Sequence, residues 1–236
     1  MIEFQPGDIL AYTQMCSAFG VSLQRGMNYR LNGQTTVILM SRRRGAPYED
    51  QISDDGTILT YEGHDCARIA GGPDPKQTDQ PGHLPSGRPT QNGLFVASID
   101  RYKENKEPFE PVCVFEKIMD GIWTFNGIFE LFDYRYQQSN GRMVYKFILR
   151  LKHQGKLGAV SPLVDPEIED RIIPSWVKQE VWKRDVGRCQ IKGCGANSGL
   201  HFDHIIPYSK GGSSKDPKNI QLLCGRHNLQ KHDKIE

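Results

Sequence analysis

The last fifth of the chain constrains the fold most, because it gathers metal-binding and proton-transferring side chains in a segment too small for a large core. Asp203 and His204 are adjacent, Asn219 follows after a loop with a glycine pair, and Asn228 comes later. Such a set can hold one hard divalent cation and one general base. Cleavage of a phosphodiester needs both, because a water must be activated and the charge on the phosphate must be stabilised.

Each of these residues also has an ordinary structural interpretation. A His beside an Asp is most often a surface pair, and a lone Asn is usually a turn residue. The joint spacing favours the nuclease interpretation over these separate roles. The local pattern agrees, because residues 200–206 form a short apolar run, residues 210–219 form a polar loop, and residues 221–231 can start a helix.

This segment resembles the HNH, or ββα-metal, nuclease family. The resemblance implies that His204 polarises the attacking water, a role that suits a neutral imidazole. It implies that Asp203 and Asn228 bind the catalytic ion through oxygen, which suits Mg²⁺ or Mn²⁺. Asn219 would brace the connecting loop and orient His204, and Lys231 would face a DNA phosphate.

Three cysteines and a histidine accompany the same segment. Cys189 and Cys194 precede it, and Cys224 and His227 lie inside it. Two ligand pairs flanking a hairpin predict a structural tetrahedral Zn²⁺ site. Many HNH domains carry four cysteines here, and Cys3His is still a good zinc set. The alternative is reduced, buried thiols, which is the interpretation for the remaining cysteines: Cys16, Cys66 and Cys113.

The chain is long enough for one large or two modest domains. Its net charge is only +2, but residues 171–236 carry 12 Lys plus Arg against 6 Asp plus Glu, whereas residues 1–170 carry 18 against 22. A basic module joined to a mildly acidic one suggests that the larger module binds something more selectively than by backbone charge. The alternative is that surface charge differs between domains without functional meaning.

Glycine and proline between residues 153 and 174 interrupt the strand pattern and mark a boundary. We predict domains over 1–152 and 174–236 with a linker over 153–173. A helix is predicted over 175–184, with Ser175 as its N-cap.

The first module is predicted to be mostly β. Apolar, β-branched runs separated by turn residues predict its strands, over 35–40, 57–61, 111–118, 121–134 and 143–151. Residues 71–93, rich in Gly and Pro, predict a long irregular loop. A loop of that length in a compact domain is either mobile or functional.

The order of motifs in this module resembles the SRA domain, a reader of 5-methylcytosine in DNA. The apolar run 36–40 leads to Tyr48-Glu49-Asp50, then to a Thr-Tyr-Glu-Gly strand at 60–63, and later to Asn-Gly-Ile-Phe at 126–129. The resemblance covers about residues 5–151. Together the two resemblances imply an α+β chain: an N-terminal SRA/PUA-like twisted β-barrel domain with few helices, then a small zinc-containing ββα-metal (HNH) domain.

A methyl group on cytosine is inspected by extruding the base into a pocket with aromatic faces and an acceptor for the exocyclic amine. The SRA resemblance implies that Tyr48 and Tyr61 are the faces and that Asp50 is the acceptor, with Gln51 standing where the eukaryotic form has its acid. Three arginines would lie at the pocket mouth near the phosphates: Arg42, Arg43 and Arg44. The alternatives are strand packing for the tyrosines and a solvated loop for the arginines.

We therefore expect an endonuclease that cuts double-stranded DNA near 5-methylcytosine or 5-hydroxymethylcytosine, similar to prokaryotic modification-dependent (type IV) restriction enzymes. One active site cuts one strand, so a double-strand break implies a homodimer or two recruited copies. Two other functions stay open. One is a homing or mobile-element HNH nuclease that reads unmodified sequence, and the other is a non-catalytic modified-DNA binding protein with a structural zinc.

The amino-terminal residues have neither a basic n-region nor an apolar h-region, and no apolar run reaches membrane-spanning length. We therefore expect a reducing cytoplasmic setting, without a disulfide framework and without a membrane partner.

Overall fold

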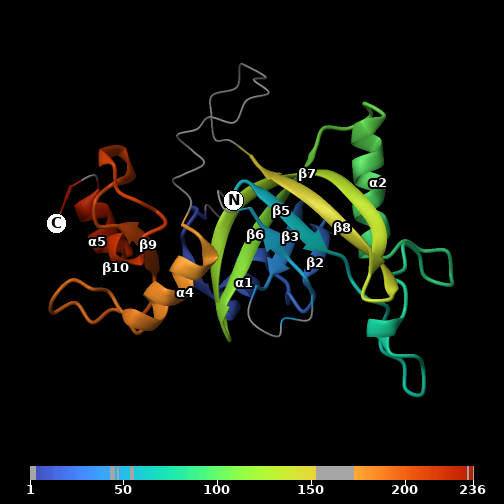
Figure 1. Cartoon of the computed structure of the whole chain (residues 1–236), viewed down its shortest axis with the longest axis horizontal. Coiled ribbons are helices and arrows are strands. Elements are labelled where there is room, and N and C mark those ends of the chain that lie inside the picture. Colours follow the sequence, from blue (N-terminus) through green and yellow to red (C-terminus); the bar gives the residue numbers. More distant parts are fainter. Residues whose placement is uncertain are drawn as a thin grey trace.

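The computed structural model describes residues 4–42, 46, 48–53, 56–152, 173–232 and 234–235, and the fold is given for these residues. Figure 1 shows two parts, a large sheet flanked by the helices α1 (Tyr12–Phe19) and α2 (Gln91–Lys103), and a smaller C-terminal part reached through the helix α4 (Ser175–Arg184). The predicted linker 153–173 lies outside the described residues except for Ile173.

The large part is built on one eight-stranded sheet within the described residues. The hydrogen-bonded path runs β2-β3-β6-β7-β8-β5-β4, with β1 paired to β7, and only the β3–β6 pair is parallel. The strands are β1 (Ile9–Ala11), β2 (Met27–Leu31), β3 (Thr35–Met40), β4 (Gln51–Ile52), β5 (Ile58–Glu62), β6 (Glu110–Met119), β7 (Ile122–Ser139) and β8 (Arg142–Leu151). This confirms a mixed α+β fold with few helices.

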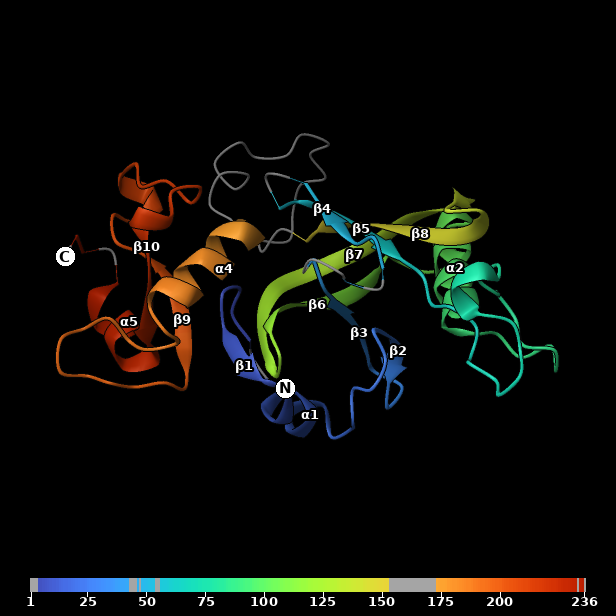
Figure 2. The ribbon, with the colours of Figure 1, turned by 60° about the horizontal axis from the view of Figure 1, so that its bottom comes forward.

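The sheet is strongly curled (Figure 2). The long strand β7 has a register shift against β8 between Leu131 and Asp133, and such bulges bend a strand and increase its twist. Asn140 and Gly141, both with positive φ, form the two-residue turn from β7 to β8. A turn of this kind matches the twist of the flanking strands, so it fixes their register.

Both faces of β3 are buried. Val37 and Leu39 belong to one core cluster with Phe115, while Ile38 and Met40 belong to another that includes residues of α2. Successive side chains of a strand point to opposite faces of the sheet. A strand that is buried on both faces is therefore a continuous run of apolar residues in the sequence. The predicted strand over 35–40 is confirmed for this reason.

Helices α1 and α2 were not predicted. The second begins inside the segment predicted as irregular, where the Thr90 side chain accepts a hydrogen bond from the Gly93 amide as an N-cap. Phe95 and Ile99 of α2 are fully buried against the sheet. A helix with so short an apolar face is stable only because it packs against the sheet.

The C-terminal part follows a strand-strand-helix order behind α4. Its elements are β9 (Leu200–His204), the 3₁₀ turns η2 (Tyr208–Lys210) and η3 (Pro217–Asn219), β10 (Ile220–Cys224) and α5 (Gly225–Lys231). The core of this part packs α4 against the hairpin through Val177, Val181, Phe202, Leu222 and Leu223. The expected ββα arrangement is therefore present.

Two local predictions were wrong here. The helix expected from residue 221 begins only at Gly225, because Ile220–Cys224 pairs with β9 and buries Leu222 and Leu223. The N-cap of α4 is Pro174 rather than Ser175. Ser175 is the first helical residue, and its hydroxyl accepts a hydrogen bond from Arg42 instead.

The two parts are in direct contact. Ile9 of β1 belongs to the C-terminal core, and the neighbouring Asp8 Oδ1 lies 2.9 Å from His201 Nδ1 of β9. The helix α4 also contacts the large sheet, because the buried Lys178 Nζ donates a hydrogen bond to Asn126 Oδ1 of β7 at 2.7 Å. Burial lowers the pKa of Lys178. None of the described helices is long and apolar enough to cross a membrane.

Candidate functional site

His204 is the last residue of β9, where the strand gives way to the loop that precedes η2. Its Nε2 lies 2.8 Å from Ser214 Oγ, and Ser214 is 1% exposed. The hydroxyl of the buried Ser214 therefore orients the imidazole. The ring itself is half-buried, so part of it stays accessible to solvent. A ring held in this way can orient and deprotonate a water.

Asn219 holds the loop that carries Ser214. Its Oδ1 accepts from the Ile206 amide at 2.9 Å, and its Nδ2 donates to the Ile206 and Ser213 carbonyls at 3.2 and 3.0 Å. A Cβ at Gly212 would collide with the Ile206 carbonyl oxygen, so only glycine allows this close crossing. Asn219 thereby fixes both ends of the loop beside His204.

Lys231 lies inside the domain rather than on a DNA-facing surface. Its side chain is 1% exposed, its Nζ donates to the His204 carbonyl at 2.6 Å, and it forms an ion pair with Asp203 Oδ2 at 3.0 Å. A buried ammonium that is already paired cannot reach a DNA phosphate. The predicted phosphate contact is therefore wrong, and Lys231 instead ties the end of α5 to the end of β9.

Asn228 stands one helical turn before Lys231 on α5. Residues three apart on a helix lie on the same face, and that face meets the end of β9 at Asp203 and His204. Asp203 directly precedes His204 on β9, and its carboxylate is 15% exposed. Asn228 is half-buried on the face of α5 that meets this end of the strand. Asp203 also accepts from Gln221 Nε2 at 3.4 Å across the hairpin.

The predicted zinc ligands come together in one cluster. The donor atoms of Cys189, Cys194, Cys224 and His227 all lie within 4.8 Å of one another. Cys194 Sγ and Cys224 Sγ are 3.8 Å apart, and Nδ1 of His227 is 3.3 Å from the thiols of Cys189 and Cys224. A tetrahedral ion with Zn–S bonds of about 2.3 Å would separate two thiolates by about 3.8 Å. The residues therefore fit a structural zinc ion.

The second group of predicted residues lies where β3, β4 and β5 approach one another. Tyr48 is half-buried, and its ring is nearly parallel to that of His64, at 28° with centroids 6.3 Å apart. Lys76 Nζ lies 3.9 Å from the Tyr48 ring centroid and pairs with Asp65 at 2.9 Å. Burial, and then the Asp65 charge, raise the pKa of Tyr48 to about 12.

Asp50 connects two strands near these rings. One carboxylate oxygen accepts from the Ser41 amide and the other from the Glu62 amide, both at 3.2 Å. Burial is the main cause that raises the pKa of Asp50, to about 6. The hydrogen bonds from the two amides act in the opposite direction, and the charge of Glu62 adds to the increase.

His64 accepts a hydrogen bond from the Met27 amide through Nε2 at 2.8 Å. Burial lowers the pKa of His64 to about 4, so the ring is neutral at pH 7.

Tyr61 and Gln51 do not lie where the resemblance implied. Tyr61 is 1% exposed inside the main core cluster, and burial raises the pKa of its hydroxyl. A ring packed on all sides offers no open face. A Cβ at Gly26 would collide with the Tyr61 hydroxyl and lie 3.3 Å from His64 Nε2. The Tyr61 hydroxyl therefore lies beside Gly26 on the side where His64 Nε2 also approaches it. Gln51 is an exposed residue of the edge strand β4.

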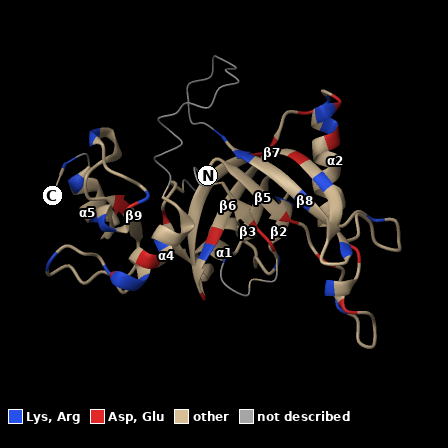
Figure 3. Cartoon of the chain, in the orientation of Figure 1, with Lys and Arg blue, Asp and Glu red and all other residues tan. Residues whose placement is uncertain are grey.

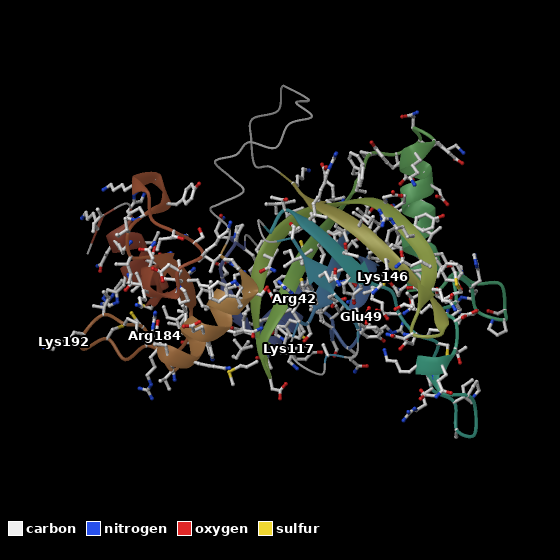
Figure 4. The ribbon with its side chains drawn as sticks, in the orientation of Figure 1. Arg42, Glu49, Lys117, Lys146, Arg184 and Lys192 are labelled. Carbon is white, nitrogen blue, oxygen red and sulfur yellow. The ribbon has the colours of Figure 1, made fainter. Side chains whose placement is uncertain are left out.

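Of the three arginines expected at the pocket mouth, only Arg42 is described. It is exposed, and its guanidinium donates to Ser175 Oγ of α4 at 3.1 Å. Figure 4 shows it beside α4, between the two parts of the chain. Arg43 and Arg44 lie outside the described residues.

Residues 187–234 match the family model described as HNH, HNH endonuclease. This range contains the cysteine–histidine cluster, the hairpin of β9 and β10, and α5. These residues form an HNH endonuclease domain.

The solved structures that are similar to this chain include SRA domains, which match about two thirds of it, and a restriction enzyme. The SRA domain of SUVH5 with hemimethylated CG DNA is 23% identical, with a TM-score of 0.46, and the match covers 67% of this chain and 97% of that one. The type IV phosphorothioation-dependent restriction endonuclease ScoMcrA is 15% identical, with a TM-score of 0.43, and the match covers 98% of this chain and 57% of that one. A search of curated proteins found none that matches.

Several residues around the two candidate sites could not be predicted from the sequence. Ser214, which holds His204, follows a glycine pair and looks like any loop serine. His64 is an isolated histidine two residues after β5. Between β5 and β8, the buried Glu62 accepts from Arg142 at 3.3 Å and from Lys146 at 2.8 Å. No sequence signal separates such buried ion pairs from surface charges.

Proposed function

We propose that this chain is a modification-dependent DNA endonuclease, in which the N-terminal domain holds an extruded 5-methylcytosine or 5-hydroxymethylcytosine and the HNH domain hydrolyses a nearby phosphodiester. The observation that carries the proposal is the arrangement at the end of β9. There His204 is oriented by Ser214, and Lys231 brings α5, with Asn228, to Asp203.

The catalytic roles follow from the atoms that this arrangement presents. The Asp203 carboxylate and the Asn228 amide offer the oxygen donors that Mg²⁺ or Mn²⁺ prefers. A bound ion would stabilise charge on the phosphate and the leaving oxygen. His204 accepts a proton from the attacking water, and the hydrogen bond to Ser214 keeps the ring in place while it does so. Lys231 orients the Asp203 carboxylate by pairing with it.

In the reader domain we assign the stacking face to Tyr48 and a second aromatic neighbour to His64, in place of the buried Tyr61. The two rings are nearly parallel, and both lie at the rim of the sheet rather than in its core. A flipped base that stacks on Tyr48 would displace the Lys76 ammonium from the ring. That step exchanges one cation–π contact for base stacking.

The acceptor for the cytosine amine is Asp50. An ionised carboxylate has about four lone-pair sites, and the Ser41 and Glu62 amides use two of them. The remaining sites can accept from an exocyclic amine, and the two amide bonds fix the direction of the group.

Charge supports a DNA partner. Lys178 and Lys231 are buried, but exposed Lys and Arg residues remain on α4, α5 and the loops of the HNH domain (Figure 3). A site with a single base and a single ion cuts one strand, so we propose that a homodimer makes double-strand breaks. The setting we propose is the cytoplasm of a prokaryote, where foreign modified DNA would be the substrate.

A digestion panel tests the function. Matched duplexes carry cytosine, 5-methylcytosine, 5-hydroxymethylcytosine, glucosylated cytosine or N6-methyladenine, and each is incubated with Mg²⁺ or Mn²⁺. We expect cleavage of the 5-methylcytosine duplex and little cleavage of the unmodified one. A phosphorothioate duplex completes the panel, because its modification lies in the backbone, where a base pocket cannot sense it. Equal cleavage of all duplexes would favour a nuclease that reads unmodified sequence, and binding without cleavage would favour a non-catalytic reader.

A further inference from the structure

A cavity of about 300 Å³ lies where the two domains meet, and neither the catalytic site nor the base pocket includes it. We name it the junction pocket. Its wall is formed by the loop after β3, by β6 and β7, by the first turn of α4 and by the loop before η3. The lining side chains that matter here are Arg42, Glu116, Asn126, Trp176, Lys178 and Lys215.

The deep end of the junction pocket holds an incomplete polar network. Glu116 is 0% exposed; its Oε2 accepts from Asn126 Nδ2 at 3.1 Å, and its Oε1 has no hydrogen-bond partner among the described residues. Lys178 Nζ, also buried, donates to Asn126 Oδ1 at 2.7 Å and makes no other hydrogen bond in the described part of the chain. A buried carboxylate oxygen left unpaired is costly, so it calls for a donor from a ligand.

The mouth of the junction pocket suits an anion. The N-cap of α4 is Pro174, no side chain of the described residues caps the helix, and its first turn carries no acidic residue. Free backbone amides and the helix dipole at such an end attract phosphate. The exposed cations Arg42 and Lys215 line the same mouth.

An aromatic ring stands beside this anion site. Trp176, in the first turn of α4, is 54% exposed, which is unusual for a side chain of this size next to a domain contact. Exposed indole rings stack readily on the faces of nucleobases. The pocket therefore combines a phosphate site, a stacking surface and a buried acceptor beside a buried donor.

We propose that the junction pocket binds one nucleotide, with its phosphate at the α4 N-terminus, its base against Trp176 and its exocyclic amine on Glu116 Oε1. The unpaired carboxylate oxygen of Glu116 and the Lys178 ammonium together match a base edge that has an amine next to a ring nitrogen. Cytosine, adenine and guanine have such an edge, whereas thymine has no exocyclic amine. A volume of about 300 Å³ is at the lower end of small-ligand pockets and fits one nucleotide rather than a larger ligand.

The position of the pocket favours DNA as the source of this nucleotide. Lys215 directly follows Ser214, which holds His204, and Arg42 (Figure 4) precedes Tyr48 by six residues in the sequence. A strand running from the base pocket to the catalytic site would therefore pass the junction pocket. This choice of source rests on the proposed function, whereas binding of a free nucleotide would not depend on it.

The first experiment scans DNA with the full-length chain in a His204→Ala background, so that the duplex stays intact. Each nucleotide around the modified cytosine is replaced in turn by an abasic site, and affinities are measured with and without Trp176→Ala. We expect one or two positions at which the missing base weakens binding roughly five- to 150-fold, and we expect Trp176→Ala to abolish that dependence. Ile69→Ala, which alters a side chain 70% exposed outside the pocket, should leave it intact.

Glu116→Gln tests the buried acceptor at the same position. A neutral amide accepts more weakly than a carboxylate, so we expect the preference for cytosine or adenine over thymine there to fall roughly fivefold. Because Glu116 is fully buried, its variant is compared with Trp176→Ala, whose exposed site leaves the core untouched. The scan is repeated on unmodified duplexes, where coupling at the same position would persist even if the modified-base proposal failed.

The second experiment titrates the protein with dCMP, dAMP and dTMP and follows the heat of binding by isothermal titration calorimetry. Saturable binding of dCMP or dAMP that Trp176→Ala removes, together with a silent abasic scan, would identify a free nucleotide as the occupant. Coupling in the scan would identify the DNA strand. If no abasic position couples to Trp176 and no nucleotide binds, the junction pocket is not a nucleotide site.

Discussion

The two proposed sites are assembled in different ways. In the HNH domain, His204, Asn219 and Asn228 lie on one hairpin and the helix that follows it. In the reader domain, Tyr48 and His64 follow different strands, and their surroundings come from distant parts of the chain. The Met27 amide, for example, binds His64, and Arg142 of β8 binds Asp65 beside Tyr48.

This difference determines for which site the spacing of residues in the sequence predicts their arrangement in the structure. Where the site residues occupy consecutive elements, their separation in sequence fixes their separation in space. Where they come from a curled sheet, burial selects which side chains remain accessible, as the buried Tyr61 shows. The predictions below test whether the HNH site is a small rigid unit and whether the reader site depends on its long-range supports.

The largest effect is expected from loss of the zinc ligands. Elemental analysis should find about one zinc per chain, and Cys189→Ser should unfold the HNH domain while leaving the reader sheet intact. Structural zinc contributes about 10–16 kcal/mol to the folding of small domains, and the core of this domain is small. Near-UV circular dichroism and zinc content measure the outcome. Cys113→Ser, at a thiol outside the cluster, is the control, and a zinc-free, active protein would refute the site.

Removal of the catalytic base comes next. His204→Ala should lower the cleavage rate at least about a hundredfold, because a general base contributes 10²–10⁴-fold. Binding to modified DNA should be nearly unchanged, because the reader lies in the other domain. His83→Ala, at an exposed histidine of the reader domain, is the matched control. Cleavage within a few-fold of wild type would exclude His204 from the mechanism.

Lys231 distinguishes an internal support from a DNA contact. Lys231→Met leaves the Asp203 carboxylate without its buried partner, and breaking such a pair costs about 3–5 kcal/mol in the free energy of unfolding. Denaturant titration measures this loss, with the exposed Lys234→Met as control. The slope of log affinity for DNA against log salt should not change. A slope lower by about 0.9 would instead indicate a lost phosphate contact.

Much of the fold was predictable where local pattern and packing agree. The strands β3, β6 and β8 and the bounds of α4 follow from apolar runs and turn residues. The helix α2 could not be foreseen, because its buried face is short and lies behind a proline-rich loop. The strand β10 was interpreted as part of a helix, because only its pairing with β9 decides between the two states for so short an apolar run.

The same distinction between local pattern and tertiary packing applies to the residues of the two sites. The zinc ligands and the HNH residues are close in sequence, and the structure brings the four zinc donors together and places Asn219 across its loop. Lys231 was assigned to the surface because sequence alone does not show burial. The same limitation applies to Tyr61, which sequence could not distinguish from the half-buried Tyr48.

The fourth prediction tests this distinction between the two tyrosines. Tyr48→Ala should weaken binding to 5-methylcytosine DNA by about 1–3 kcal/mol, the usual contribution of base stacking, and should barely affect unmodified DNA. Tyr61→Phe keeps the buried ring and should change neither affinity. Fluorescence anisotropy with matched duplexes measures the ratio. If Tyr61→Phe lowers the ratio and Tyr48→Ala does not, the pocket uses the buried side of the sheet.

The smallest effect is expected from pH, through Asp50. Burial raises the pKa of Asp50 to about 6, so acidification from pH 7.5 to 5.5 protonates a large share of this carboxyl. A protonated carboxyl is a weaker acceptor for the cytosine amine, and the ratio of modified to unmodified binding should fall a few-fold over this window. Asp50→Asn should show a low ratio with no such pH dependence.

Unfolding cannot account for that loss. The folded-state pKa of Asp50 lies above its ordinary value of 3.8, so its contribution to stability is fully present below about pH 4 and is lost as pH rises through about 6. Acidification therefore stabilises the fold through this group while it weakens recognition. Nearby Glu62 raises the pKa and Lys146 lowers it, so Lys146→Met should move the transition to higher pH. Identical pH profiles for wild type and Asp50→Asn would remove Asp50 from the reader site.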